Sequence, residues 1–278
     1  DRGADEIVVE VLPGLPAYNG MRCASAHVSD LQTGKLKRFG TTPTEGTLSI
    51  GLGIKSFWQE VPGTEGRRLK MTGGGFAGKV EIGDGISWHH KATEARNQTM
   101  AMNSEDLVFE NIIMPNVSNM GMLAGYNRNL TFRKIRFEPE NGNLAVGGRD
   151  GLHLSMNAGK LLVEDCYFKG LRMDPLVIRL SFGIVASVDD DRTLTIKPGY
   201  PVPAGGKLRV WVGDGPVDVL VESATKVSGV SSTYRYELAQ EFPAGTKEGT
   251  AVTYLTYSLD EGVIRNCVFE DNFGSPII

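Results

Sequence analysis

The stretch Phe109-Glu110-Asn111-Ile112-Ile113-Met114 carries apolar residues at its first, fourth and sixth positions, with a turn-forming pair at the second and third. The same pattern returns as FRKIRF at 132–137, VEDCYF at 163–168 and IRNCVF at 264–269. Successive copies start 23, 31 and 101 residues apart. A repeat of about 23 residues is typical of one coil of a right-handed parallel β-helix, whose coils stack about 4.8 Å apart. The pattern therefore predicts coils over residues 95–182 and a returning coil over 258–278.

A second apolar pair follows each copy at a matching offset. The pairs are Met122/Ala124, Leu152/Leu154 and Leu176/Ile178, and a last apolar residue, Ile277, stands near the end of the chain. Each coil is therefore expected to hold a second strand in register with its neighbours. This register places Asp150, Asp174 and Ser275 at equivalent positions, with Met120 in the coil before.

The spacing of 101 residues requires an insertion of about 75 residues between two coils. Residues 183–257 alternate short strand-like runs with Gly, Pro and Asp turns, which predicts a small antiparallel barrel or sandwich. Residues 1–94 have a similar texture and are expected to form a second inserted β subdomain. The predicted fold is thus all-β: a right-handed parallel β-helix interrupted by small antiparallel β insertions. We also expect the full-length protein to continue at both ends.

Composition narrows the function classes. Gly is 35 of 278 residues, about twice its usual share, which favours many turns between short strands. The formal net charge is -4 and no Lys/Arg run stands out, so nucleic acid is not expected as a partner. No apolar run reaches the 18 residues of a membrane span, and residues 1–20 lack the apolar core of a signal peptide.

Cysteine and turn residues in the repeat have structural interpretations. Cys166 and Cys267 occupy the same interior position, and we expect small core residues there rather than a disulfide or a nucleophile. With Cys23 they have no metal-ligand spacing, and no metal or cofactor is predicted. Asn111, Asp165 and Asn266 recur at the turn, where Asn and Asp tolerate left-handed backbone geometry.

Asp150 and Asp174 are the candidate catalytic residues. Carboxylates on neighbouring coils would lie on the order of 5–9 Å apart, given the coil spacing and side-chain reach. Glycosidic bond cleavage requires such a pair, one carboxyl protonated and one ionised, and like charges on adjacent coils raise one pKa. Taken singly, each Asp would be read as a turn or loop residue, before Gly151 and Pro175 respectively.

Further residues beside the acids are candidate substrate ligands. Strand alternation is expected to send His153, Ser155 and Arg179 outward, and Arg149 precedes Asp150. All four are candidate substrate ligands, and His153 and Arg179 could either bind sugar hydroxyls or orient a carboxylate. Elsewhere, Gly73-Gly74-Gly75 is interpreted as a flexible turn. Trp88-His89-His90 could border a sugar site or end a strand, and packing is the default reading for Trp58 and Trp211.

Several of these segments resemble glycoside hydrolase family 110. They are Arg149-Asp150-Gly151-Leu152-His153-Leu154, KLLVEDCYF at 160–168, Met173-Asp174-Pro175, and the opening of the insertion, VASVDDDRTL at 185–194. The resemblance spans most of residues 96–270 and implies an α-galactosidase that releases terminal α-1,3-linked galactose with inversion from a secreted or periplasmic location. It matches Asp150 and Asp174 to acidic residues of the family's active site, but Met173 stands where the family usually has a second, adjacent acid.

Two other functions stay open. Met173 motivates a non-catalytic module, either glycan-binding or structural in the manner of a phage tailspike. A polysaccharide lyase would use Arg179 or Lys160 as the base and Ca²⁺ to neutralise a uronate, although the sequence offers no compact Asp/Glu cluster for that ion. All three functions imply a glycan partner; none fixes the sugar or the oligomeric state.

Overall fold

The computed structural model describes residues 2–3, 6–23, 25–37, 56–72, 78–89, 97–213 and 215–278. Its regular elements are strands, apart from the short 3-10 turn η2 (Leu255–Tyr257). The prediction of an all-β chain is confirmed. The glycine run at 73–75 and His90 lie outside the described residues.

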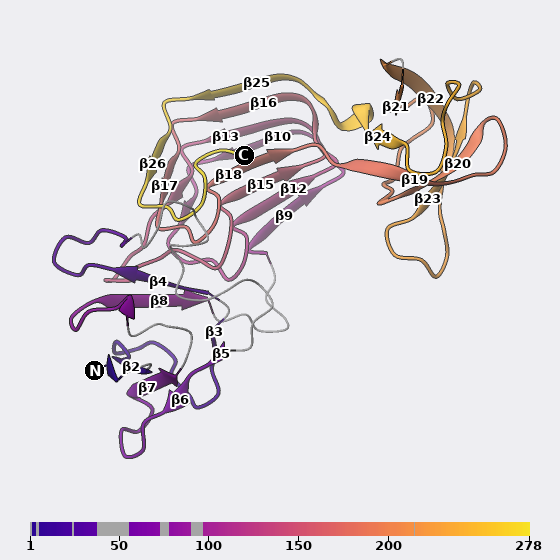
Figure 1. The fold of residues 1–278 in the computed structure, drawn as a ribbon. Helices are drawn as coiled ribbons and strands as arrows, with labels where there is room; N and C mark the ends of the chain where they lie inside the picture. The colour runs from indigo at the N-terminus through magenta and orange to yellow at the C-terminus, as the bar shows by residue number, and fades with distance from the viewer. Residues whose placement is uncertain are drawn as a thin grey trace.

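Three four-stranded parallel sheets form the centre of the molecule (Figure 1). The first consists of β9 (Thr99–Met102), β12 (Met122–Gly125), β15 (Leu152–Ser155) and β18 (Leu176–Arg179). The second consists of β10 (Glu105–Glu110), β13 (Arg128–Arg133), β16 (Ala158–Glu164) and β25 (Leu259–Arg265). The third consists of β11 (Ile113–Met114), β14 (Arg136–Phe137), β17 (Tyr167–Lys169) and β26 (Val268–Glu270). Each pass of the chain, here called a coil, adds one strand to each of the three sheets in turn.

The strand register follows the sequence repeat. Phe109 pairs with Phe132, Phe132 with Val163, and Val163 with Ile264. In the other series Met122 pairs with Leu152, Leu152 with Leu176, and Leu176 bridges to Ile277. Both predicted alignments are confirmed, including the one that spans the long insertion.

Left-handed turns recur where the sequence predicts them. Asn111, Asp165 and Asn266 have φ angles of 57°, 54° and 55°. Lys134 adopts the same conformation at the equivalent position, with φ 54°. The side chains of Asn266 and Asp165 are also hydrogen-bonded from one coil to the next, at 3.1 Å. These residues therefore serve turn geometry, as expected.

Aromatic side chains stack inside the parallel sheets. Phe137 and Phe168 lie 5.6 Å apart and Phe168 and Phe269 lie 4.9 Å apart, with rings inclined by 14° and 2°. Cys166 is buried in the same core, and Cys267 packs against its edge. Since equivalent residues of successive coils lie directly above one another, one apolar column fills the interior.

A closed antiparallel barrel stands between β18 and β25. Its strands, in barrel order, are β19 (Phe182–Val188), β20 (Thr193–Lys197), β23 (Tyr234–Leu238), β22 (Gly215–Lys226), β21 (Lys207–Val212) and β24 (Ala251–Thr253). The barrel has its own buried core around Tyr236 and Tyr254. Trp211 lies on its outer surface, where its indole N–H donates to Thr253 Oγ1 at 2.8 Å.

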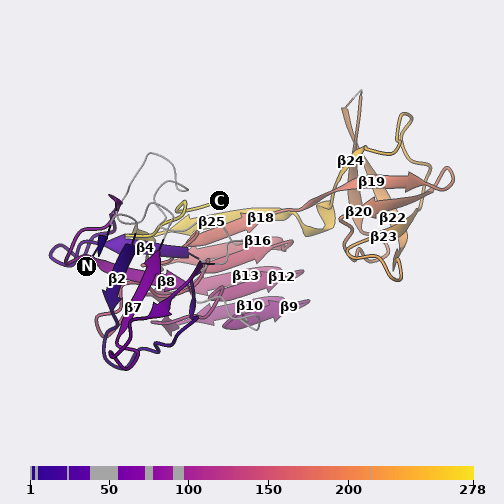
Figure 2. The same cartoon turned by 60° about the horizontal axis from the view of Figure 1, so that its bottom comes forward.

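The N-terminal residues form small antiparallel sheets at the end of the coils opposite the barrel (Figures 1 and 2). One sheet contains β1 (Arg2–Gly3), β2 (Glu6–Glu10), β7 (Arg68–Thr72) and β6 (Gln59–Glu60). The others pair β3 (Arg22–Cys23) with β5 (Ser56–Phe57), and β4 (Ser25–Ser29) with β8 (Gly85–His89). Trp58 is buried in their core against Trp88, so packing explains both.

Candidate functional site

Asp150 and Asp174 stand at equivalent positions, two residues before β15 and β18. The Gly151 amide donates to the Asp174 carbonyl at 3.1 Å, and the Gly121 amide donates to the Asp150 carbonyl at 2.9 Å. The backbone therefore stacks the two acidic positions on adjacent coils. Both lie at the end of the first sheet where β15 and β18 begin.

Asp150 is held inside the molecule, with only 2% of its surface exposed. Its Oδ2 atom lies 2.7 Å from His153 Nδ1, in a buried pair. Its Oδ1 atom is buried and has no hydrogen-bond partner among the described residues. A buried carboxylate oxygen without a partner is costly, so such an atom usually marks a functional position or a water site.

Asp174 is half-buried and carries a shifted pKa. Its Oδ1 atom accepts a hydrogen bond from the Ser275 amide at 2.9 Å. Burial raises the pKa of this carboxyl and the charge of Asp150 raises it further, while the Ser275 amide, His153 and Arg149 lower it in part. The charge of Asp150 on the adjacent coil thus raises the pKa of Asp174, although burial is the larger cause.

Arg149 adds a cation beside the two acids. The residue is partly buried, and its Nε atom is buried without a hydrogen-bond partner in the part of the chain that the structure describes. Arg149 Nε and Asp150 Oδ1 are therefore an unpaired donor and an unpaired acceptor on consecutive residues. A polar ligand such as a sugar hydroxyl could satisfy both.

Strand β8 supports the loops that carry the acids. The ring of His89 lies against Gly148, where an added Cβ would come within 2.4 Å of His89 Nε2, so only glycine fits. That same Nε2 is 3.3 Å from the carbonyl oxygen of Ser118. Arg172 Nη1 donates to the carbonyl of Ser87 at 2.7 Å. Gly148 leads into Arg149-Asp150 and Arg172 leads into Met173-Asp174, so one strand touches both loops.

Arg172 is a site-supporting residue that the sequence analysis missed. It is 8% exposed, and burial lowers the pKa of its guanidinium to about 10. The signal for it was the coil alignment, because the bridge between Gly147 and Leu171 places Arg172 opposite Gly148. Of the two readings of Trp88-His89-His90, a border of a sugar site or the end of a strand, the structure matches the second for His89, which is the last residue of β8 and is buried against Gly148.

Two of the predicted ligands, Ser155 and Arg179, lie away from the acids. Ser155 pairs with Arg179 at the last positions of β15 and β18, near the junction with the barrel. They lie three residue steps along the strands from Leu152 and Leu176, which corresponds to about 10 Å. His153 is 9% exposed and so does not project freely outward as expected, because the Asp150 carboxyl and the neighbouring coil cover it.

A cleft of about 1280 Å³ lies between the N-terminal strands and the segment 141–145. Arg172, Ser87 and Trp88 contribute to its wall, but Asp150 and Asp174 do not. Within the described ranges no group of three or more His, Cys, Asp or Glu side chains is arranged to hold a metal ion. None of the described residues belongs to a helix long and apolar enough to cross a membrane.

Comparisons with known proteins give distant relatives of one kind. No family model matches the chain. Over 176 residues, 60% of this chain, it is 26% identical to alpha-1,3-galactosidase B of Bacteroides thetaiotaomicron and covers 28% of that protein. Over 77 residues, 27% of this chain, it is 26% identical to alpha-1,3-galactosidase A of Bacteroides fragilis and covers 13% of that protein. The matches thus span less than a third of either relative, and the chain is distantly similar to proteins named as galactose-releasing glycosidases.

Proposed function

We propose that this chain carries the acidic centre of a glycosidase that releases terminal α-linked galactose, as a member of glycoside hydrolase family 110. The observation that supports this most is the raised pKa of Asp174 beside Asp150 on the neighbouring coil. A carboxyl with a raised pKa keeps its proton closer to neutral pH, as a general acid requires. The names of the two relatives, both alpha-1,3-galactosidases, agree with a galactoside as substrate.

In the proposed reaction Asp174 protonates the departing sugar oxygen as the bond from that oxygen to the anomeric carbon breaks. A water molecule attacks the anomeric carbon from the opposite face, and its proton passes to the ionised Asp150, which His153 holds at 2.7 Å. The anomeric configuration is thereby inverted. Arg149 and His153 bind hydroxyls of the galactose, while Ser155 and Arg179 meet only a substrate that extends along the strands.

The proposed scaffold is a right-handed parallel β-helix with two insertions. The three parallel sheets and the recurring register support stacked coils over 95–182 and 258–278. The closed barrel supports the proposed insertion over 183–257, and the proposed N-terminal subdomain spans 1–94. Because the proposed substrate is a glycan outside the cytoplasm, we place the protein in the periplasm or outside the cell.

The test is galactose release from an α-1,3-linked galactosyl disaccharide by the 278-residue chain. Asp150→Asn and Asp174→Asn should each reduce the rate by roughly 10²-fold or more, since each removes a proton-transfer group. Asp191→Asn is the matched control, because Asp191 is an exposed turn residue of the distant barrel. Rates that stay unchanged in both site variants would remove these assignments.

A glycan-binding module without turnover is the second candidate. It is favoured by Met173, where the resemblance expects an acid, and by the near-complete burial of Asp150. This candidate predicts a saturable calorimetric signal with α-galactosides and no free galactose after prolonged incubation. Release of galactose that depends on Asp174 would exclude it.

A further inference from the structure

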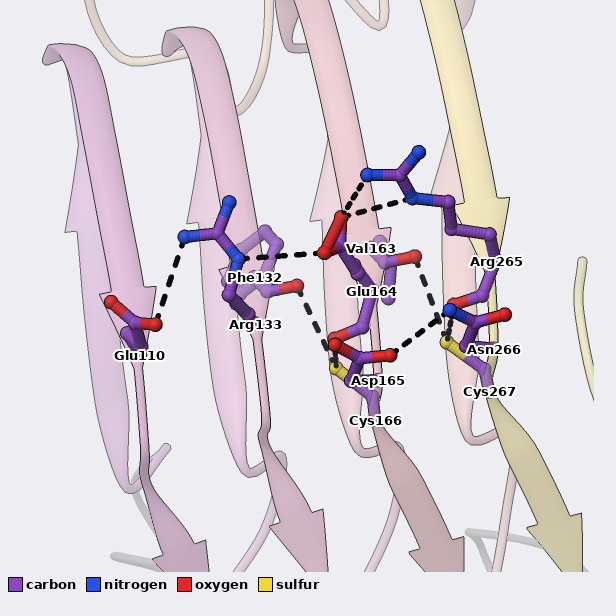
Figure 3. A network of polar contacts seen from close by, with 10 residues as sticks. All are labelled: Glu110, Phe132, Arg133, Val163, Glu164, Asp165, Cys166, Arg265, Asn266 and Cys267. Carbon is purple, nitrogen blue, oxygen red and sulfur yellow. Dashed lines mark hydrogen bonds and ion pairs between the residues drawn. The ribbon is translucent and has the colours of Figure 1, made fainter.

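Two cysteines face each other across the coil that departs for the barrel and the coil that returns. Glu164 pairs with Arg265 and Tyr167 pairs with Val268, so Cys166 and Cys267 occupy the same step between them (Figure 3). The Val268 amide donates to the Cys166 carbonyl at 2.9 Å. Paired strands lie about 4.8 Å apart, which is within the Cα separation of about 4.4–6.8 Å that disulfides span.

The sulfur of Cys267 is directed back toward the coil of Cys166. Its Sγ donates to the carbonyl of Val163 at 3.6 Å, while Cys166 Sγ donates to the carbonyl of Phe132, one coil earlier, also at 3.6 Å. Cys166 is 1% exposed, whereas Cys267 is only partly buried. An external reagent therefore reaches Cys267 first, and Cys166 is the thiol beneath it.

The two thiols also differ in acidity. A hydrogen bond from the Cys166 thiol lowers the pKa of Cys267, and the same contact together with burial raises the pKa of Cys166. Cys267 therefore forms a thiolate more readily than Cys166, and the thiolate is the reactive form in disulfide exchange. The pair has the arrangement of a partly buried, accessible attacking thiol with a fully buried resolving thiol.

We propose that Cys166 and Cys267 form a disulfide under oxidising conditions and so staple the returning coil to the coil before the barrel. The Cys267 thiolate attacks one sulfur of a small-molecule disulfide such as oxidised glutathione and releases one glutathione thiolate. Cys166 loses its proton to solvent and attacks the Cys267 sulfur of the mixed disulfide, which releases the second glutathione. The two cysteines lose two electrons in total, and glutathione disulfide gains them.

The staple encloses the whole barrel in a covalent loop. Its length makes it effective, because closing a long loop removes much of the disorder available to the unfolded chain. The stapled coil includes Ser275, whose amide binds Asp174, so the redox state of the pair acts on the support of that carboxyl. The disulfide itself does not depend on the proposed glycosidase activity.

The test is oxidation of the purified chain with oxidised glutathione at pH 8, followed by thiol counting in denaturant and peptide mapping. Of the 3 cysteines, wild type should keep one free thiol, on Cys23, and yield a peptide pair that joins Cys166 to Cys267. The midpoint of thermal unfolding should be several degrees higher for oxidised than for reduced wild type. Cys23→Ser is the matched control and should retain both effects, whereas Cys166→Ser should accumulate a glutathione adduct on Cys267.

Peptide mapping of the wild-type protein tests for the disulfide between Cys166 and Cys267 even if a variant fails to fold. Three free thiols after oxidation, or a lasting glutathione adduct on Cys267 of wild type, would overturn the proposal. So would a cross-link that involves Cys23.

Discussion

Asp174 carries a charge that its surroundings make unfavourable. Burial and Asp150 raise the pKa of this carboxyl above its ordinary value. Between the ordinary and the raised pKa the folded state binds more protons than the unfolded state, so stability falls as pH rises through this window. At neutral pH the folded protein is therefore less stable than it would be with an ordinary carboxyl at position 174. Such a loss of stability is common where a group is suited to proton transfer.

The first prediction concerns Asp174→Asn. An amide keeps an oxygen that can accept from the Ser275 amide but carries no charge, so we expect the melting temperature at pH 7 to rise by roughly 1–3 °C. The gain should be smaller at pH 4, because a carboxyl with a raised pKa takes up its proton earlier as the pH falls. Calorimetric scans at both pH values measure this, and a lower melting temperature for the variant at pH 7 would contradict the assigned burial of charge.

A buried pair of asparagines stabilises the turns after β12 and β15. Asn127 Nδ2 donates to Asn157 Oδ1 at 3.0 Å and to the Ala101 carbonyl at 2.9 Å. Asn157 Nδ2 donates in turn to the Ala124 carbonyl at 3.0 Å. Side-chain amides thus connect three successive coils where their backbone turns inside the molecule.

The second prediction is that Asn127→Ala lowers the free energy of unfolding by about 2–4 kcal/mol. The change leaves buried backbone and amide groups without partners, which costs more than the bonds themselves. Urea unfolding measures the effect, with Asn143→Ala in the partly buried segment 141–145 as the control. A loss below about 0.5 kcal/mol, typical of a surface position, would show that the ladder is not essential.

The candidate acids could be found from sequence, but their environment could not. Register alone aligned Asp150 with Asp174, because pairing of apolar residues in the strands fixes what stands two residues earlier. The burial of Asp150 depends on His153 and on β8, which is distant in sequence and has no repeat to align it. The asparagine pair was missed for a different reason: its members lie outside the six-residue pattern on which the alignment was built.

At the level of strands, neighbouring coils are held by ion pairs on the surface and by stacked rings inside. Glu110, Arg133, Glu164 and Arg265 alternate in charge across the second sheet, with Glu164 between both arginines (Figure 3). Side-chain exposure of 14% for Glu164 makes it the least solvated member. Inside, Phe168 is fully buried between the rings of Phe137 and Phe269.

The third prediction is that Phe168→Ala destabilises the chain by about 3–5 kcal/mol, because it removes a buried ring from a continuous column. Phe168→Leu keeps most of the volume and should cost about 1.5 kcal/mol. Chemical denaturation followed by circular dichroism compares the two. Equal losses would indicate that ring stacking and volume do not govern this core.

The repeating elements were predictable because their period is explicit in the sequence, and both predicted alignments match the observed strand pairs. For the N-terminal sheets, only the presence of short strands was predicted, and their pairing was not. Their strands pair antiparallel over long separations, such as β2 with β7, and no internal repeat fixes which strands meet. The barrel was recognisable from turns and alternation, but its strand order β19-β20-β23-β22-β21-β24 depends on closure, which local patterns do not encode.

In the whole molecule, the barrel and the N-terminal strands occupy opposite ends of the coils (Figure 1). Asp174 stands two residues before β18, whereas the barrel begins after the far end of that strand. The barrel therefore lies a strand length away from the acids, and β8 contacts their loops directly.

The fourth prediction contrasts these two ends. Replacing residues 183–256 by a short Gly/Ser linker should leave the rate of galactose release unchanged, although it exposes Met156, which packs against the barrel core. His89→Ala should lower the rate by roughly 10–100-fold with little change in the melting temperature, because it frees the loop at Gly148. Parallel assays with thermal scans separate the two effects; the reverse order of rates would assign the support of the site to the barrel.

The assignment of Asp174 as the proton donor is tested most directly by the leaving-group dependence of the Asp174→Asn variant. The nitrophenolate of a nitrophenyl α-galactoside leaves without protonation, whereas the sugar that leaves a galactosyl disaccharide must be protonated by the acid. If Asp174 is the general acid, the variant loses roughly 10²-fold or more on the disaccharide and retains most of its rate on the nitrophenyl substrate. Equal losses on both substrates, or no loss on the disaccharide, would contradict the assignment.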